Sequence, residues 1–126
     1  MARNERNEQI VRDFFAAWTK LDPDRIVDFF SEDAVYHNIP LQRIEGKPAI
    51  RETIAGWCGQ MESIDFVFRH IVSEGDLVLM ERCDVVPSPS GPHELPIMAI
   101  LELRDGKIAA WREYFDLAQM NAASAG

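Results

Sequence analysis

The order of the apolar patterns along the chain constrains its fold more than any other feature. Up to residue 59, apolar side chains recur mainly at helical spacing, and from residue 63 to 116 they follow strand patterns separated by turn residues. Helices followed by hairpin-connected strands make an α+β arrangement. Three helices on one face of a bent antiparallel sheet would enclose a cavity. We therefore expect a cone-shaped, curved, mostly antiparallel sheet, wrapped by N-terminal helices around an apolar pocket.

The expected elements follow from local signals. Asp22-Pro23 predicts a helix N-cap followed by proline at the first helical position, and Asp105-Gly106 predicts a hairpin turn. The predicted helices span about 4–20, 22–31 and 46–59, and the predicted strands span about 34–38, 63–73, 77–86, 93–103 and 107–116.

Composition narrows the class of protein. The 126 residues suit a single domain over 1–126, and the hydrophobic content of 47% allows a real core. The net charge of −8 argues against nucleic acid as a partner, because binding phosphates needs clustered Lys and Arg. No apolar run is long enough to span a membrane, and the charged start lacks an apolar signal core, so we expect a cytoplasmic protein. Cys58 and Cys83 form no CxxC motif, and the sequence leaves open whether they form a disulfide with each other.

Several catalytic signatures are absent from the sequence, namely GxSxG, GxGxxG, the P-loop and HExxH. His37, His70 and His93 show no metal-ligand spacing, so we interpret them as surface or strand-edge residues and expect no metal or organic cofactor. What remains is polar residues within apolar strands.

Arg82 and Asp84 lie two residues apart and therefore share one face of a strand with apolar neighbours. They must pair there, since an isolated buried charge is very costly. An ordinary ion pair on a half-exposed strand explains the same pattern. Tyr36 and Asn38 have the same spacing and could hold a water molecule, or could simply be a strand end and a turn residue.

The last predicted strand is ambiguous. Asp116 shares a face with Arg112 and Tyr114, while Trp111 and Phe115 occupy the opposite, more core-like face. Simple alternation of side chains therefore predicts that Asp116 faces solvent. A sheet covered on both faces, by helices on one side and a second subunit on the other, would remove the conflict. Periodicity leaves both arrangements open.

Three sequence fragments, in this order, resemble the limonene-1,2-epoxide hydrolases, which belong to a SnoaL-like, nuclear-transport-factor-like and ketosteroid-isomerase-like superfamily. The fragments are Tyr36-His37-Asn38-Ile39-Pro40-Leu41, Glu81-Arg82-Cys83-Asp84-Val85, and Gly106-Lys107-Ile108 with Trp111-Arg112-Glu113-Tyr114-Phe115-Asp116-Leu117. The resemblance implies five catalytic residues, Tyr36, Asn38, Arg82, Asp84 and Asp116.

In the mechanism implied by the resemblance, Asp116 acts as general base on a water that Tyr36 and Asn38 help to hold. Protonated Asp84 donates to the epoxide oxygen, and Arg82 lies between the two carboxylates. A small or medium lipophilic epoxide would become a vicinal diol in one step, with no covalent enzyme intermediate. The scheme requires Asp116 to face the pocket beside Arg82.

The resemblance also implies a homodimer and an apolar pocket. Candidate pocket residues are Phe14, Trp18, Ile39, Leu41, Met80, Ile97, Met98, Ile100 and Phe115. Two alternatives remain open. A ketosteroid-isomerase-like or polyketide-cyclase-like enzyme could use the same fold, although such isomerases typically carry a tyrosine on an early helix, where this chain has Phe14 and Phe15. A non-catalytic small-molecule binding module is the other alternative.

Overall fold

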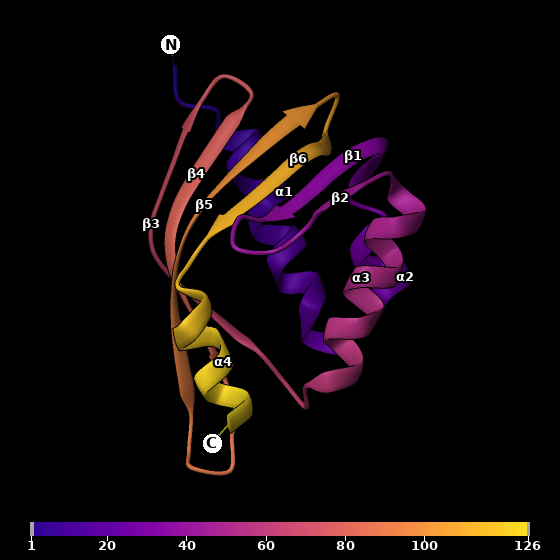
Figure 1. The fold of residues 1–126 in the computed structure, drawn as a ribbon. Coiled ribbons are helices and arrows are strands. Elements are labelled where there is room, and N and C mark those ends of the chain that lie inside the picture. Colours follow the sequence, from indigo (N-terminus) through magenta and orange to yellow (C-terminus); the bar gives the residue numbers. More distant parts are fainter. Residues whose placement is uncertain (1, 126) are drawn as a thin grey trace.

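The structure is a computed structural model that describes the fold of residues 2–125 and the side chains of 2–122. Helices cover one side of a strongly curved sheet (Figure 1). The helical elements are α1 (Glu5–Ala16), the 3-10 helix η1 (Ala17–Lys20), α2 (Pro23–Val27), α3 (Lys47–Gln60) and α4 (Leu117–Ala125). The strands are β1 (Phe30–Asn38), β2 (Arg43–Glu45), β3 (Asp65–Glu74), β4 (Leu77–Val86), β5 (His93–Arg104) and β6 (Lys107–Tyr114). The predicted α+β class is confirmed.

The six strands form one sheet in the order β2-β1-β6-β5-β4-β3. All neighbouring pairs are antiparallel except β1 and β6, which run parallel and so bring the first long strand beside the last. The sequence analysis missed β2 and α4 and placed the end of the last strand two residues too late, at Asp116. These differences fall at element ends and in short elements, where periodicity carries little information.

The first helix begins and ends as local chemistry dictates. The Asn4 side chain accepts a hydrogen bond from the backbone N–H of Asn7 and so caps α1. The apolar stripe of α1 and η1 then buries Phe14 and Trp18 against the sheet. The helical run ends at Leu21, whose φ of 51° is left-handed, and Asp22 caps α2 as predicted.

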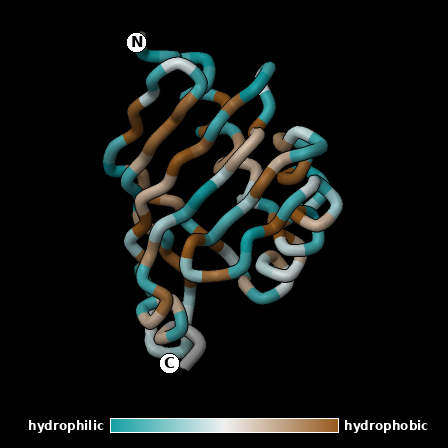
Figure 2. The backbone as a smooth tube through the Cα atoms, turned by 45° about the horizontal axis from the view of Figure 1, so that its top comes forward, coloured by the Kyte–Doolittle hydropathy of each residue, from teal (hydrophilic) through white to brown (hydrophobic). Residues whose placement is uncertain are grey.

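The sheet presents its apolar side chains to the helices and bends around them. Along β5 the residues Leu95, Ile97 and Ala99 are buried, whereas Met98 between them is 54% exposed. Figure 2 shows that hydrophobic residues run along the strands of the sheet. Register shifts in β3, between Phe68 and His70, and in β5 mark irregularities of the kind that bend a sheet.

Trp111 on β6 lies at the centre of the aromatic core. Its ring meets Phe14 edge-on at 4.9 Å between centroids and stacks on Tyr36 at 4.3 Å with an interplanar angle of 7°. The contact with Tyr36 crosses the parallel β1–β6 pairing, in which the two residues are direct neighbours. The core therefore fixes β1 and β6 relative to each other, and these are two of the three strands that carry site residues.

The structure also bears on membrane-spanning helices and on the two cysteines. No helix within residues 2–125 combines the length and apolarity needed to cross a bilayer. Cys58 and Cys83 are both free thiols, so the disulfide left open by the sequence does not form.

Candidate active site

Arg82 occupies the inner face of β4 and is 1% exposed. Its Nε donates to Asp84 Oδ1 at 2.8 Å, and its Nη2 donates to Asp84 Oδ2 at 3.1 Å. The predicted pairing of these two side chains is confirmed, and its depth excludes the half-exposed surface pair that the sequence had left open.

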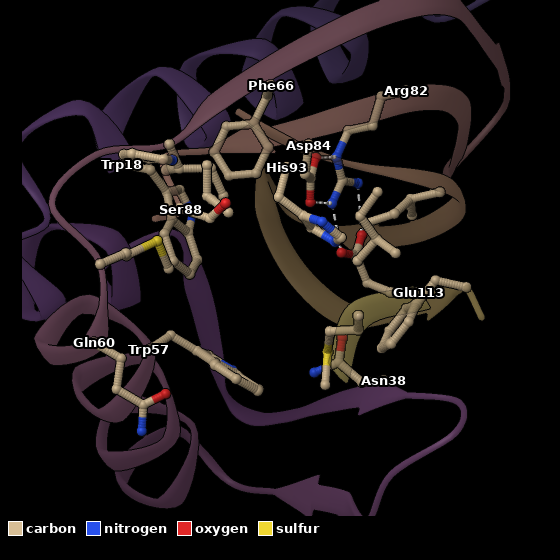
Figure 3. A pocket seen from close by; sticks show the side chains of 18 of the residues that line it. Trp18, Asn38, Trp57, Gln60, Phe66, Arg82, Asp84, Ser88, His93 and Glu113 are labelled. Carbon is tan, nitrogen blue, oxygen red and sulfur yellow. Dashed lines mark hydrogen bonds and ion pairs between the residues drawn. The ribbon is translucent and has the colours of Figure 1, made fainter. Parts of the chain in front are cut away.

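Glu113, on the inner face of β6 and so two strands away from Arg82, completes the cluster (Figure 3). Arg82 Nη1 donates to Glu113 Oε2 at 2.6 Å, and Nη2 donates to Glu113 Oε1 at 2.5 Å. The indole Nε1 of Trp111 donates to Glu113 Oε2 at 2.7 Å. One buried guanidinium therefore lies between two carboxylates that come from different strands.

Asp116 does not join this cluster, which corrects the sequence-based assignment. It is exposed, lies beyond the end of β6, and its Oδ1 accepts a hydrogen bond from the backbone N–H of Gln119 at 3.2 Å. That geometry makes it the N-cap of α4 rather than a wall of the pocket. The physical reason is that successive side chains of a strand point to opposite faces. Glu113 therefore shares the inward face of Trp111 and Phe115, and Asp116 does not. Alternation along the sequence had already placed Asp116 toward solvent. The sequence analysis missed that Glu113 lies on the same core-like face as Trp111 and Phe115.

The guanidinium of Arg82 has all of its hydrogen-bonding capacity in use. Of its five N–H groups, four are taken by the two carboxylates, and Nη1 also lies 3.6 Å from the sulfur of Met80. The rings of Phe15 and Phe66 lie against it, with centroids 4.5 and 5.2 Å from Cζ. Arg82 is thus positioned to orient the carboxylates rather than to bind a ligand itself.

Burial raises the pKa of Asp84 to about 6, with Arg82 acting in the opposite direction and the charge of Glu113 adding to the rise. Two carboxylates that share one cation in a poorly solvated site favour retention of one proton. Asp84 can therefore exchange a proton nearer to neutral pH than an ordinary aspartate.

Tyr36 and Asn38 both line the same pocket as the charged cluster. Burial and the nearby charge of Glu113 raise the pKa of Tyr36, which keeps it a neutral phenol with a hydroxyl proton to donate. The structure therefore brings four of the five predicted residues into one cavity and replaces the fifth with Glu113.

The pocket has a volume of about 710 Å³ and lies between the sheet and the helices. Of the predicted pocket residues, Trp18, Ile97 and Phe115 line it. Lining residues that the sequence analysis did not name as pocket or site residues are Trp57, Gln60, Met61, Glu62, Ile64, Phe66, Val86, Pro87, Ser88, Pro89, His93, Leu95, Trp111, Glu113 and Met120.

The other predicted pocket residues lie elsewhere. Phe14 and Met80 are buried in the core and do not line the cavity. Met98 and Ile100 alternate with the buried residues of β5 and so face the outer side of the sheet. The remaining two, Ile39 and Leu41, belong to the connection between β1 and β2 and are absent from the lining.

The histidines differ in where they lie relative to the pocket. His70 is exposed, as expected, but His93 at the start of β5 lines the pocket. Across residues 2–125, no three His, Cys, Asp or Glu side chains come together in a way that could hold a metal ion.

Comparison with known proteins agrees with this architecture. Residues 11–111 match the SnoaL-like domain family. The chain belongs to this family, which has the nuclear-transport-factor-like fold, and the superfamily inferred from the sequence fragments is confirmed.

Particular relatives add detail. Epoxide hydrolase EphG of Mycobacterium tuberculosis is 27% identical over 110 residues, which cover 87% of this chain and 73% of EphG. The structure of an LEH-like epoxide hydrolase from M. tuberculosis superposes with a TM-score of 0.79 at 24% identity, covering 94% of this chain and 89% of that one. SalBIII, an epoxide hydrolase/cyclase-like enzyme in pyran ring formation, gives a TM-score of 0.78 at 20% identity, with 91% and 94% covered. The fold is shared with enzymes of more than one activity.

Proposed function

We propose that this protein is an epoxide hydrolase, which adds water to a lipophilic epoxide and releases a vicinal diol without a covalent enzyme intermediate. The observation that supports this most directly is the buried Asp84–Arg82–Glu113 cluster in an otherwise largely apolar pocket. Opening an epoxide with water needs a proton donor for the ring oxygen and a base for the water. Two carboxyl groups at one site, one serving as acid and one as base, meet both needs.

Asp84 serves as the acid. Its pKa of about 6, raised by burial, leaves roughly a tenth of the group protonated at pH 7, far more than for an ordinary aspartate. Both of its oxygens accept from Arg82, which fixes the plane of the carboxyl group at the wall of the cavity. Protonation of the ring oxygen stabilises the alkoxide that develops as the C–O bond breaks.

Glu113 serves as the base. Its Oε2 accepts from Arg82 and Trp111, whereas Oε1 accepts from Arg82 alone among the described residues. A carboxylate oxygen has two lone-pair sites, so Oε1 can accept a further hydrogen bond, from water. Asn38 and the phenol of Tyr36 line the same cavity and are proposed to orient that water.

The proposed step balances as follows. The water oxygen forms a bond to one epoxide carbon while the bond from that carbon to the ring oxygen breaks. Glu113 takes one proton from the water, and Asp84 gives its proton to the ring oxygen. A proton then passes from Glu113 to Asp84 through solvent, which restores the cluster for the next turnover.

A single-turnover reaction in isotopically labelled water tests this function. The protein, in excess over a panel of terpene, cycloalkene and longer lipophilic epoxides, should release diol in which one oxygen carries the label. Unlabelled diol would indicate an enzyme ester, and an unlabelled cyclic ether would indicate attack by a substrate hydroxyl. Either product, or the absence of turnover with every epoxide, contradicts the proposal.

We further propose that the protein forms a homodimer through the outer face of its sheet. Large apolar side chains there are about half exposed, and Met98 and Tyr114 are direct neighbours across β5 and β6. A two-fold contact would cover this patch with its own copy. Such a contact leaves the pocket, on the opposite face, open to substrate.

A further inference from the structure

The pocket contains a second polar feature that the hydrolysis mechanism does not use. Among the described residues, three buried side-chain polar atoms lack a hydrogen-bond partner: Nε1 of Trp18, Nε1 of Trp57 and Nε2 of His93. All three residues line the pocket. The unpartnered atoms of the described residues thus all belong to side chains that line one cavity.

The two indoles specify what kind of group could satisfy them. An indole N–H only donates, so its partner must be an acceptor. A buried donor without a partner costs about 1–3 kcal/mol, and phenylalanine would line a purely hydrocarbon pocket without that cost. The ring nitrogen of His93 donates or accepts according to its tautomer, so it fits the same acceptor without defining it.

Packing holds Trp18 in place. The side chain is 3% exposed, and its ring contacts Phe66 and Trp111 edge-on at 5.8 and 6.2 Å between centroids. It comes from η1, and Trp57 comes from α3, so both belong to the helical wall of the pocket. Figure 3 shows Trp57 and Gln60 on that wall, across the cavity from Arg82, Asp84 and Glu113 on the sheet.

The charges of the lining indicate a neutral acceptor. Glu62, Asp84 and Glu113 are its carboxylates, and Arg82 is its one permanently charged cation within the part of the chain described. Because both carboxylates of the cluster already occupy Arg82, an anionic ligand would gain no partner and would meet repulsion. A carbonyl, ether or ester oxygen meets no such penalty.

We infer that the helical wall is a subsite for an uncharged oxygen acceptor, so that the preferred substrates are oxygenated epoxides rather than pure hydrocarbon ones. Trp18 and Trp57 donate to an oxygen remote from the oxirane while the oxirane faces Asp84. The inference rests on the proposed hydrolase function for the identity of the substrate, but the subsite itself can be tested without any reaction.

The binding test uses carvone and limonene, which share a skeleton, carry no oxirane and differ chiefly in one ring carbonyl. The indole N–H resonances are followed by ¹⁵N–¹H NMR and assigned with single Trp→Phe variants. Carvone should move the signals of Trp18 and Trp57 in the direction of hydrogen bonding, and limonene should not. The Trp111 indole, already bonded to Glu113, is the internal control. Equal responses to both ligands would overturn the subsite.

The kinetic test uses the side-chain epoxides of the same two compounds. The ratio of kcat/KM, oxygenated over hydrocarbon substrate, should be about tenfold in the parent protein, as one or two hydrogen bonds to buried donors allow. Trp57→Phe should lower the ratio toward one, whereas Met120→Leu, which changes the pocket lining without removing a donor, should leave it unchanged. A parent ratio near one refutes the subsite while leaving the hydrolase function standing. Carvone-specific shifts with neither epoxide hydrolysed would support the subsite and reject the hydrolase.

Discussion

Replacing Glu113 with glutamine is the most direct test of the site. The substitution preserves the size of the side chain but removes the charge and turns one acceptor into an NH₂ donor. That donor would face either an Arg82 N–H group or, if the amide flips, the N–H groups of both Arg82 and Trp111. Either orientation removes a hydrogen bond and the proposed base together.

The magnitudes follow from these contacts. Breaking a buried ion pair by removing one partner costs about 3–5 kcal/mol, and retention of the Arg82–Asp84 pair places Glu113→Gln toward the lower end of that range. A domain of this kind has about 5–15 kcal/mol of stability, so the variant should stay folded. Loss of the general base should lower kcat by about 10²–10⁴-fold.

The assay measures diol formation from an epoxide hydrolysed by the parent protein, with circular dichroism and the thermal midpoint recorded for each variant. Glu113→Asp keeps the charge but withdraws the carboxylate by one methylene, and should retain more activity than Glu113→Gln. Asp116→Asn is the matched control. Asparagine also caps helices well, so this change should alter kcat by no more than about twofold, a few tenths of a kcal/mol.

One pattern of results would refute the reasoning. If folded Glu113→Gln turned over at a rate within about threefold of the parent, a difference of less than 1 kcal/mol, Glu113 could not be the base. If Asp116→Asn lost activity at the same time, the exposed cap of α4 would have to move into the pocket during turnover.

Three further predictions concern Asp84, Arg82 and the outer face of the sheet. Burial raises the pKa of Asp84 to about 6, above the roughly 3.9 of an unfolded chain, so the folded state binds an extra proton between these values. The free energy of unfolding should therefore fall as pH rises from about 4 to 6, and kcat should decline above about pH 6. Asp84→Asn should flatten this change in pH-dependent denaturation and nearly abolish turnover. The lysine in Arg82→Lys cannot reproduce five N–H contacts, so we expect a loss of roughly 2–4 kcal/mol in the free energy of unfolding and a reduced kcat. Equal thermal midpoints for variant and parent would contradict the described cluster. Met98→Glu should convert the proposed dimer to a monomer in analytical ultracentrifugation with its pocket chemistry retained, and a parent protein that sediments as a monomer would dismiss the dimer.

Much of the fold could be read from local chemistry. The capping residues Asn4 and Asp22 mark the starts of two helices, and the hairpin turn at Asp105-Gly106 lies where its residues predict. Period-two patterning placed Arg82 and Asp84 on one face and required them to pair, as they do. Short-range rules suffice in these cases because the interacting groups lie a few residues apart.

The site itself was only partly predictable. Fragment resemblance favoured Asp116 as the second carboxylate, while alternation along the strand placed Asp116 toward solvent. The structure follows the alternation, and Glu113, which the sequence analysis did not name, takes the inward position. The pocket residues on α3, such as Trp57, carried no signal in the sequence that linked them to β4 or β6. Such contacts depend on how helices are laid over a sheet, which no short window of sequence records.

The sequence by itself determined the class of the fold, the pairing of Arg82 with Asp84 and the apolar character of the interior, because each depends on the spacing of neighbouring residues. The tertiary structure decided which acidic residue shares the guanidinium and which indole N–H groups line the pocket. Those outcomes depend on where β6 ends, how β1 lies parallel to it, and how the sheet curves around the helices. They are set by contacts between residues distant in sequence, whose geometry exists only in the folded chain.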